Sequence, residues 1–405
     1  MRSGNPSKSH DLAGLTSLRG IAAIMIVMFH FAAFGGETPL IDQTAFFDKA
    51  YLWVDMFFML SGFVIAHVYG EAFERHVDLP SYGRFMWIRF ARIYPLYGFA
   101  LLSYVAITLA RYAVRGPVVF DDEHTLAALI ETAALVQAWG FFNLYAWNPP
   151  AWSISAEVVA YLAFPFLCIV VLRSRLARSA VGIVAVGVLC LLSARERALQ
   201  VPAGLSVALC LSEFIIGMVL YRSREALYRW RVPVDLLLTL TVLLLALALH
   251  FGAPDLVVVA LFAPLIWLLP ASSGIALRIV NARPLVFLGE ISYSVYLMHD
   301  LVLFIFVRLT GGFEKLIQEA AGVVVVIGVA ALTHRYVERP ARVWLRSCWQ
   351  SRPATITPLV ASRGQALAAD ATPIARSPIS DLRRWPGAEN GPPRSSEATP
   401  SGKSC

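Results

Sequence analysis

The sequence alternates between apolar runs of about twenty residues and short clusters of arginine. A bilayer span needs such a run in a helix, because lipid offers no partner to backbone N–H and C=O groups. Hydrophobic residues make up 58% of the chain and charged residues 15%, against about 25% charged in a soluble domain. We therefore expect an all-α fold, a polytopic transmembrane helix bundle.

Runs long enough to cross a bilayer occur throughout the first 350 residues. They lie at residues 12–34, 51–69, 93–111, 152–172, 179–193, 202–221, 233–250, 255–270, 284–307 and 321–338. Two of them, 179–193 and 255–270, are shorter than usual. We predict about ten spans in one transmembrane domain, residues 1–350.

A further apolar stretch, 124–142, contains Glu131 and Gln137. Basic residues concentrate on the cytoplasmic side of a membrane protein, and those before the first span place the N-terminus there. If 124–142 spanned, the arginines of 173–178 and 222–231 would fall outside, whereas otherwise they fall inside. We therefore predict that 124–142 is one extra interfacial or re-entrant helix on the outer face, and that both termini are cytoplasmic.

The composition excludes two other kinds of site. The net charge of +7 comes from clusters between apolar runs, without the basic face that nucleic-acid binding needs, so we predict no nucleic-acid partner. None of the five cysteines shows metal-ligand spacing, so we predict no metal. The partner that the composition does indicate is membrane lipid. Nothing in the sequence indicates an oligomeric state.

The two ends of the chain differ from the spans. The first apolar run carries Arg19 and His30 and lacks a convincing cleavage site, which indicates a transmembrane helix rather than a removed signal peptide. From Ser351 onward the chain is rich in Pro, Ser, Arg, Ala and Gly without periodicity. Such a segment buries too little surface to order itself, and we predict a disordered cytoplasmic tail at 351–405.

Ionisable side chains inside spans are costly and indicate functional sites. Arg19 and His30 are three helical turns apart, so both lie on one face of the first span, roughly 16 Å apart. A snorkelling arginine and a core histidine bonded to a carbonyl are the alternative. Asp55, Glu157 and His299 fall at the depth of His30 in their own spans, where a carboxylate would orient an imidazole or share its proton.

Three smaller patterns remain, and the first two have two possible interpretations each. Ser61-Gly62, near the middle of the second span, suits either a nucleophile or close helix packing. Arg89 and Arg92 share a helix face and form either an anion clamp or ordinary cytoplasmic charge. Glu338, two residues before Pro340, is typical of a helix stop.

Five motifs follow one another along the chain: Arg19-x10-His30, Asp55-Met-Phe-Phe-Met-Leu-Ser-Gly62, Arg89-x-x-Arg92, Trp152-Ser-Ile-Ser-Ala-Glu157 and Gly289-x-x-Ser-Tyr-x-x-Tyr-Leu-x-His299. In this order they resemble the acyltransferase 3 family of integral membrane O-acyltransferases. The family commonly has Asp-Gly where this chain has Thr16-Ser17, so no role of that carboxylate carries over.

The resemblance implies an acyl-CoA donor, often acetyl-CoA, and a carbohydrate or glycolipid hydroxyl as acceptor. The Arg- and Ala-rich composition points to a bacterium, and we expect the protein in its inner membrane. His30 matches the family's catalytic histidine, and Arg89 and Arg92 match its paired arginines. We expect these arginines, with Arg19, to bind the cofactor.

The expected mechanism has His30, oriented by Asp55 or Glu157, removing the proton of the acceptor hydroxyl. His299 joins this catalytic group, and Ser61 is the candidate for an acyl-enzyme. The alternative is a transporter of a glycan or small acid, because buried charges also line substrate pathways. No paired broken helices in equivalent halves support it.

Overall fold

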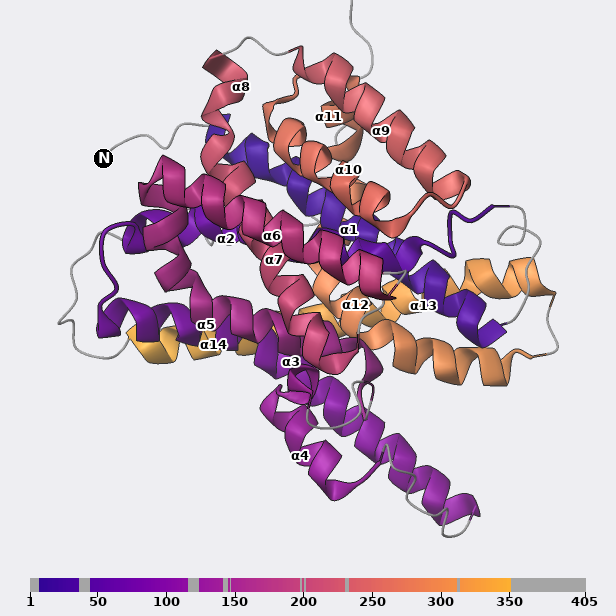
Figure 1. Cartoon of the computed structure of the whole chain (residues 1–405). Helices are drawn as coiled ribbons and strands as arrows, with labels where there is room; N and C mark the ends of the chain where they lie inside the picture. The colour runs from indigo at the N-terminus through magenta and orange to yellow at the C-terminus, as the bar shows by residue number, and fades with distance from the viewer. Residues whose placement is uncertain are drawn as a thin grey trace, which may run out of the picture.

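The computed structural model describes residues 7–35, 44–115, 124–140, 145, 147–196, 199, 202–229, 233–311 and 314–350. All regular elements in these ranges are helical (Figure 1), which confirms the all-α class. The α-helices are α1 (Ser7–Gly35), α2 (Trp53–Phe73), α3 (Leu79–Arg115), α4 (Leu126–Ala134), α5 (Trp152–Arg173), α6 (Arg175–Glu196), α7 (Ala203–Ser223), α8 (Glu225–Arg229), α9 (Val234–His250), α10 (Asp255–Leu268), α11 (Ile275–Val280), α12 (Arg283–Leu309), α13 (Lys315–Thr333) and α14 (Arg339–Gln350). Short 3-10 turns lie at Ala50–Leu52 (η1), Gln137–Trp139 (η2), Pro149–Ala151 (η3) and Leu269–Ala271 (η4), and a π-helical turn at His334–Glu338 (η5).

Eight helices in the described ranges are long and apolar enough to cross a membrane. They cover Ala13–Phe31, Ala50–Phe73, Leu79–Arg111, Pro149–Arg173, Arg175–Glu196, Ala203–Leu227, Arg283–Leu309 and Lys315–Trp349. The chain is thus an integral membrane protein, but the predicted count of about ten spans is not confirmed. The remaining two predicted spans correspond to α9 and α10, which have 17 and 14 residues. They form a hairpin that turns at Gly252, whose φ of 64° favours glycine.

The described part of the stretch 124–142, residues 124–140, does not form one long helix. Thr125 caps α4, its Oγ1 accepting a hydrogen bond from the backbone N–H of Ala128 at 3.1 Å. α4 has nine residues and ends at Leu135, which adopts a left-handed φ of 59°. This break leaves too few residues for a span, in agreement with the prediction that the stretch does not cross. α4 lies beside the projecting C-terminal part of α3 (Figure 1), bonded to it through the Tyr94 hydroxyl.

The C-terminal end of the bundle differs from the prediction. We predicted a helix stop around Glu338 and Pro340, and this is wrong, because the chain stays helical through η5 and α14 as far as Gln350. A proline inside an α-helix removes one hydrogen bond and clashes with the preceding turn. The π-turn η5 directly precedes Pro340 and changes the local hydrogen-bond register. The predicted tail, 351–405, lies outside the described residues.

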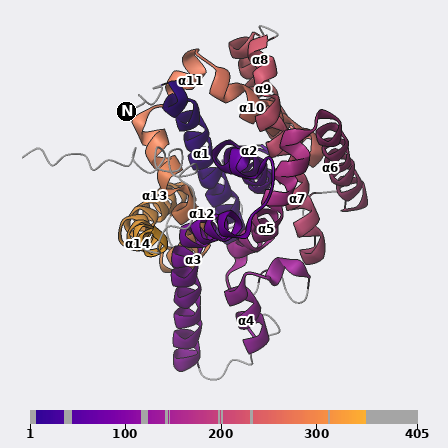
Figure 2. The same cartoon turned by 90° about the vertical axis from the view of Figure 1, so that its left-hand side faces the viewer.

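Two pairs of helices at the centre of the bundle, α2 with α7 (Figure 2) and α1 with α12, meet at backbone contact. A Cβ atom added to Gly62 of α2 would overlap the carbonyl oxygen of Phe214 in α7, and one added to Gly217 of α7 would overlap that of Met59. In the same way, Gly289 of α12 faces the backbone of α1. Gly62 therefore has the packing role that the sequence left open, and it fixes the rotation of α2 within the bundle.

We expect Gly217→Ala to destabilise the protein by about 3 kcal/mol or more, because a well-packed backbone contact has no room for a methyl group. Gly187→Ala is the matched control, since a Cβ there meets nothing within 4 Å. Thermal unfolding of the purified protein in detergent measures both. Equal melting temperatures for the two variants would contradict this account of the α2–α7 contact.

Candidate active site

A cavity of about 150 Å³ lies inside the bundle, between α1, α2, α3, α5 and α12. Its polar lining consists of Arg19, Ser61, Arg89, Arg92, Ser153, Glu157, Tyr161, Ser292, Tyr293 and Tyr296. Its apolar lining consists of Val54, Phe57, Phe58, Leu60, Val64, Ile65, Ile93 and Ile154. The structure thus brings together five residues that the sequence singled out on four different helices: Arg19, Ser61, Arg89, Arg92 and Glu157.

Helical periodicity explains which side chains of α2 reach the cavity. Phe57, Ser61 and Val64 follow an i, i+4, i+7 spacing and are half-buried, while their neighbours Gly62 and Phe63 are buried against other helices. Gly62 faces α7, and Ser61, one position before it, is turned to the cavity that α5 and α12 help to line. Close packing on one side of α2 therefore presents the Ser61 hydroxyl on the other.

The cavity has an excess of positive charge. Among its described lining residues three are arginines, and Glu157 is the one carboxylate. The guanidinium of Arg89 donates to the Tyr69 hydroxyl at 3.1 Å and lies 5.0 Å from the centroid of that ring and 5.8 Å from that of Tyr161. Aromatic faces and a hydroxyl stabilise a cation without neutralising it. The site therefore suits an anionic ligand.

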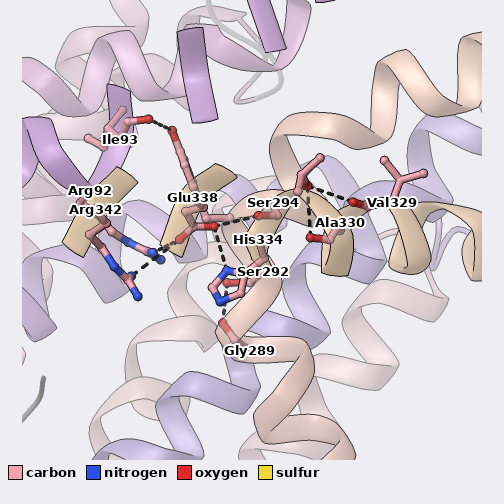
Figure 3. Close-up of polar contacts among 12 residues, drawn as sticks. Arg92, Ile93, Gly289, Ser292, Ser294, Val329, Ala330, His334, Glu338 and Arg342 are labelled. Atoms are coloured by element: carbon pink, nitrogen blue, oxygen red, sulfur yellow. Dashed lines mark hydrogen bonds and ion pairs between the residues drawn. The ribbon is translucent and has the colours of Figure 1, made fainter. Parts of the chain in front are cut away.

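Arg92 has a carboxylate partner that the sequence analysis treated only as a helix stop. Glu338, 1% exposed, forms an ion pair with Arg92, and it also accepts from the Ser294 hydroxyl at 2.7 Å. His334 Nδ1 lies 3.0 Å and Arg342 Nη1 3.7 Å from the same carboxylate (Figure 3). A signal was available: His334, Glu338 and Arg342 are spaced four residues apart, which places them on one helix face.

Glu157 lies within hydrogen-bonding reach of the hydroxyls of Ser61 and Tyr161, and near the charges of Arg89 and Arg19. Both the carboxylate and the Ser61 side chain are half-buried, since each is open to the cavity. A hydroxyl, a carboxylate and two guanidiniums thus converge on one space in the bundle. Such a set contains the groups that acyl transfer requires: a nucleophile, a base and positive charge for an oxyanion.

His30 and His299 form a second group, outside the cavity lining. Their ring centroids are 4.7 Å apart, and the ring of His299 is 5.8 Å from that of Tyr296, which does line the cavity. Nδ1 of His30 lies 3.0 Å from the Ile26 carbonyl oxygen and Nδ1 of His299 lies 2.5 Å from that of Tyr296. A carbonyl only accepts, so each Nδ1 carries the proton and each neutral ring keeps its basic lone pair on Nε2.

The structure does not bring Asp55 to this histidine pair. Asp55 is 4% exposed and its carboxyl meets that of Glu213, a fully buried residue of α7. Neither of the predicted orienting groups serves His30, because Asp55 faces Glu213 and Glu157 faces Ser61. The sequence analysis did not single out Glu213, although an ionisable residue within an apolar run was signal enough.

We expect Glu338→Ala to lower the free energy of unfolding by about 3–5 kcal/mol, because it leaves the half-buried guanidinium of Arg92 without its carboxylate partner. Glu225→Ala is the matched control, since Glu225 is 72% exposed and pairs with Arg222 at 3.6 Å. Thermal unfolding in detergent gives the comparison. The double variant Arg92→Ala/Glu338→Ala should recover part of the loss, and an additive effect would argue against a coupled pair.

Known proteins resemble this chain over most of its length. The model of the acyltransferase 3 family, described as an acyltransferase domain, matches residues 12–335. A protein of Streptomyces mycarofaciens named acyltransferase MdmB is 28% identical over 401 residues, covering 87% of this chain and 96% of that protein. Protein 2 in the picA locus of Rhizobium radiobacter is 38% identical over 155 residues, covering 36% of this chain and 76% of that protein. No solved structure matches.

Proposed function

Because the chain belongs to the acyltransferase 3 family, we propose that it moves an acyl group from an acyl-CoA to a hydroxyl of a carbohydrate. Acyl transfer itself follows from the family. The observation that supports this choice of donor and acceptor is the cavity, which combines three arginines with Ser61 and Glu157. We place the protein in the inner membrane of a bacterium, with both termini in the cytoplasm, since the basic clusters then face inward.

Acyl-CoA fits the charge of the cavity. The donor carries phosphates at one end and a neutral thioester at the other, and the planar guanidinium binds phosphate oxygens in pairs. Arg19 and Arg89 have no ion-pair partner within 4.0 Å among the described residues, whereas Arg92 is held by Glu338. We assign the phosphates to Arg89 and Arg92, with Arg19 completing the cationic wall.

The size of the cavity favours a short acyl group. An enclosed apolar space of about 150 Å³ accommodates a molecule the size of benzene, and this cavity has the same volume. The apolar half of its lining comes mainly from α2, through Val54, Phe57 and Val64 among others. Acetyl is the acyl group that we propose, since it fills such a space together with the thioester.

The acceptor hydroxyl must lose a proton as it attacks. The two histidines offer Nε2 lone pairs, and Nε2 of His299 is buried without a hydrogen-bond partner among the described residues. An imidazole of this tautomer can accept a proton at Nε2. We propose that His30, paired with His299, removes the proton, and that the acceptor is a carbohydrate or glycolipid, as in the family that the chain resembles.

We expect Arg89→Ala/Arg92→Ala to abolish the preference of the enzyme for acetyl-CoA over acetyl-pantetheine, which lacks the nucleotide phosphates. The KM for acetyl-CoA should rise by about 10–100-fold, as for the loss of one or two charge-assisted hydrogen bonds. Release of free CoA by the purified protein with a panel of oligosaccharides is the measurement. Arg175→Ala, an exposed basic residue away from the cavity, is the control, and an unchanged preference in the double variant would refute phosphate binding by these arginines.

We expect His30→Ala to reduce transfer to the acceptor by about 10²–10⁴-fold, the usual contribution of a general base. His76→Ala changes an imidazole that is 76% exposed in its side chain and serves as the control. Acylated product, separated by chromatography from reactions with equal amounts of folded protein, gives the rate. Full activity of His30→Ala would exclude His30 as the base.

A further inference from the structure

We propose that Ser61 carries the acyl group as a covalent ester between donor and acceptor, with Glu157 as its general base. This inference rests on the proposed acyl-CoA donor. It assigns the two steps of the reaction to two bases, Glu157 for the first and His30 for the second.

Three serines line the cavity, and their hydroxyls are not equivalent. The Ser292 hydroxyl donates to the backbone carbonyl of Gly289 at 2.8 Å, and the Ser153 hydroxyl bonds the Tyr296 hydroxyl at 2.7 Å. The Ser61 hydroxyl instead lies within reach of the Glu157 carboxylate. A serine becomes a nucleophile when a base accepts its proton, and Ser61 is the cavity serine with a carboxylate in that position.

The surroundings of this pair suit the charge that develops during attack. Attack on a thioester turns its carbonyl oxygen into an oxyanion, which fixed positive charges stabilise. Arg19, which is not assigned to the phosphates, lies close enough to Glu157 to interact with its charge and lines the cavity. A carbonyl placed at Ser61 would therefore lie between the nucleophile and the guanidinium of Arg19.

The backbone around Ser61 holds the hydroxyl in place. Gly62, the next residue, contacts the backbone of Phe214, so α2 cannot rotate about its axis without a clash. Glu157 lies on α5 and is held near Tyr161 of the same helix. Both members of the pair are thus on rigid helices, which keeps their geometry within the narrow limits that catalysis needs.

The histidine pair then belongs to the second half of the reaction. Neither His30 nor His299 lines the cavity, but the ring of His299 lies 5.8 Å from that of Tyr296, which does. An ester on Ser61 stays in place after CoA has left. The acceptor hydroxyl can then enter the space that CoA has vacated, with the histidine base at its edge.

The chemistry balances without any further reactant. Oγ of Ser61 attacks the thioester carbonyl carbon while its proton passes to Glu157; the C–S bond breaks, and the proton moves from Glu157 to the thiolate, giving CoA. The acceptor oxygen then attacks the ester carbonyl carbon and gives its proton to His30. The C–O bond to Ser61 breaks, and the serine oxygen regains a proton from that histidine.

The test is acylation of the purified full chain by radiolabelled acetyl-CoA in the absence of acceptor. We expect one acetyl group per chain, located by peptide mass spectrometry on Ser61, and a burst of CoA of equal size. Ser61→Ala should lose the label, while Ser153→Ala and Ser292→Ala, which remove the other two cavity hydroxyls, should keep it. Glu157→Gln should slow labelling by about 10²-fold or more, as for loss of a general base.

Two further measurements separate the possible failures. Ser61→Cys should form a thioester, which neutral hydroxylamine cleaves, whereas it leaves the serine ester intact. Labelling of this variant would show that the fold tolerates a change at position 61. With acceptor present, parallel double-reciprocal plots support the acyl-enzyme. Intersecting plots with CoA release but no label would overturn the role of Ser61 alone, whereas no CoA release with any acceptor would overturn the proposed donor as well.

Discussion

The backbone contact between α2 and α7 determines which side chains of α2 face the cavity at the centre of the bundle. Gly62 and Gly217 each press against a carbonyl of the opposite helix, so the two helices have one allowed rotation relative to each other. In lipid, where apolar side chains gain little by leaving their solvent, close packing of this kind is what holds helices together. The rotation that it imposes places Ser61 on the cavity wall and brings Asp55 to Glu213.

The charges inside the bundle are arranged as two unlike environments. Around the cavity there are three arginines and one carboxylate, Glu157, and a second carboxylate, Glu338, pairs with Arg92. Positive charge is therefore in excess, and a bound anion is favoured there. Between α2 and α7, the carboxyl groups of Asp55 and Glu213 are both buried and lie close together. Because these environments lie on opposite sides of α2, the carboxyl pair does not neutralise the arginines, and the cavity keeps its positive charge.

The sequence predicted the features that the membrane imposes on a chain, and missed those that depend on the rotation of its helices. Apolar run length predicted the long helices, but not the break after Ala134 in a stretch predicted as one interfacial helix. The motifs predicted Arg19, Ser61, Arg89, Arg92 and Glu157, which share the cavity. Depth in the bilayer also grouped Asp55 with His30, and the structure separates them. Two residues at one depth can face different neighbours, because depth is one coordinate and the direction around the helix axis is another. That direction is set by contacts such as Gly62 with Phe214, far apart in sequence.

The same distinction bears on how an enzyme in a membrane can join two polar substrates. If the histidine base and the thioester had to meet in one space, both substrates would occupy a cavity of about 150 Å³ at once, which is too small for a thioester arm and a sugar together. Holding the acyl group on Ser61 removes that requirement, because CoA leaves before the acceptor enters. The acceptor then needs to bring only its reacting hydroxyl into the bundle. The rest of the sugar stays in water, where its other hydroxyls keep their hydration.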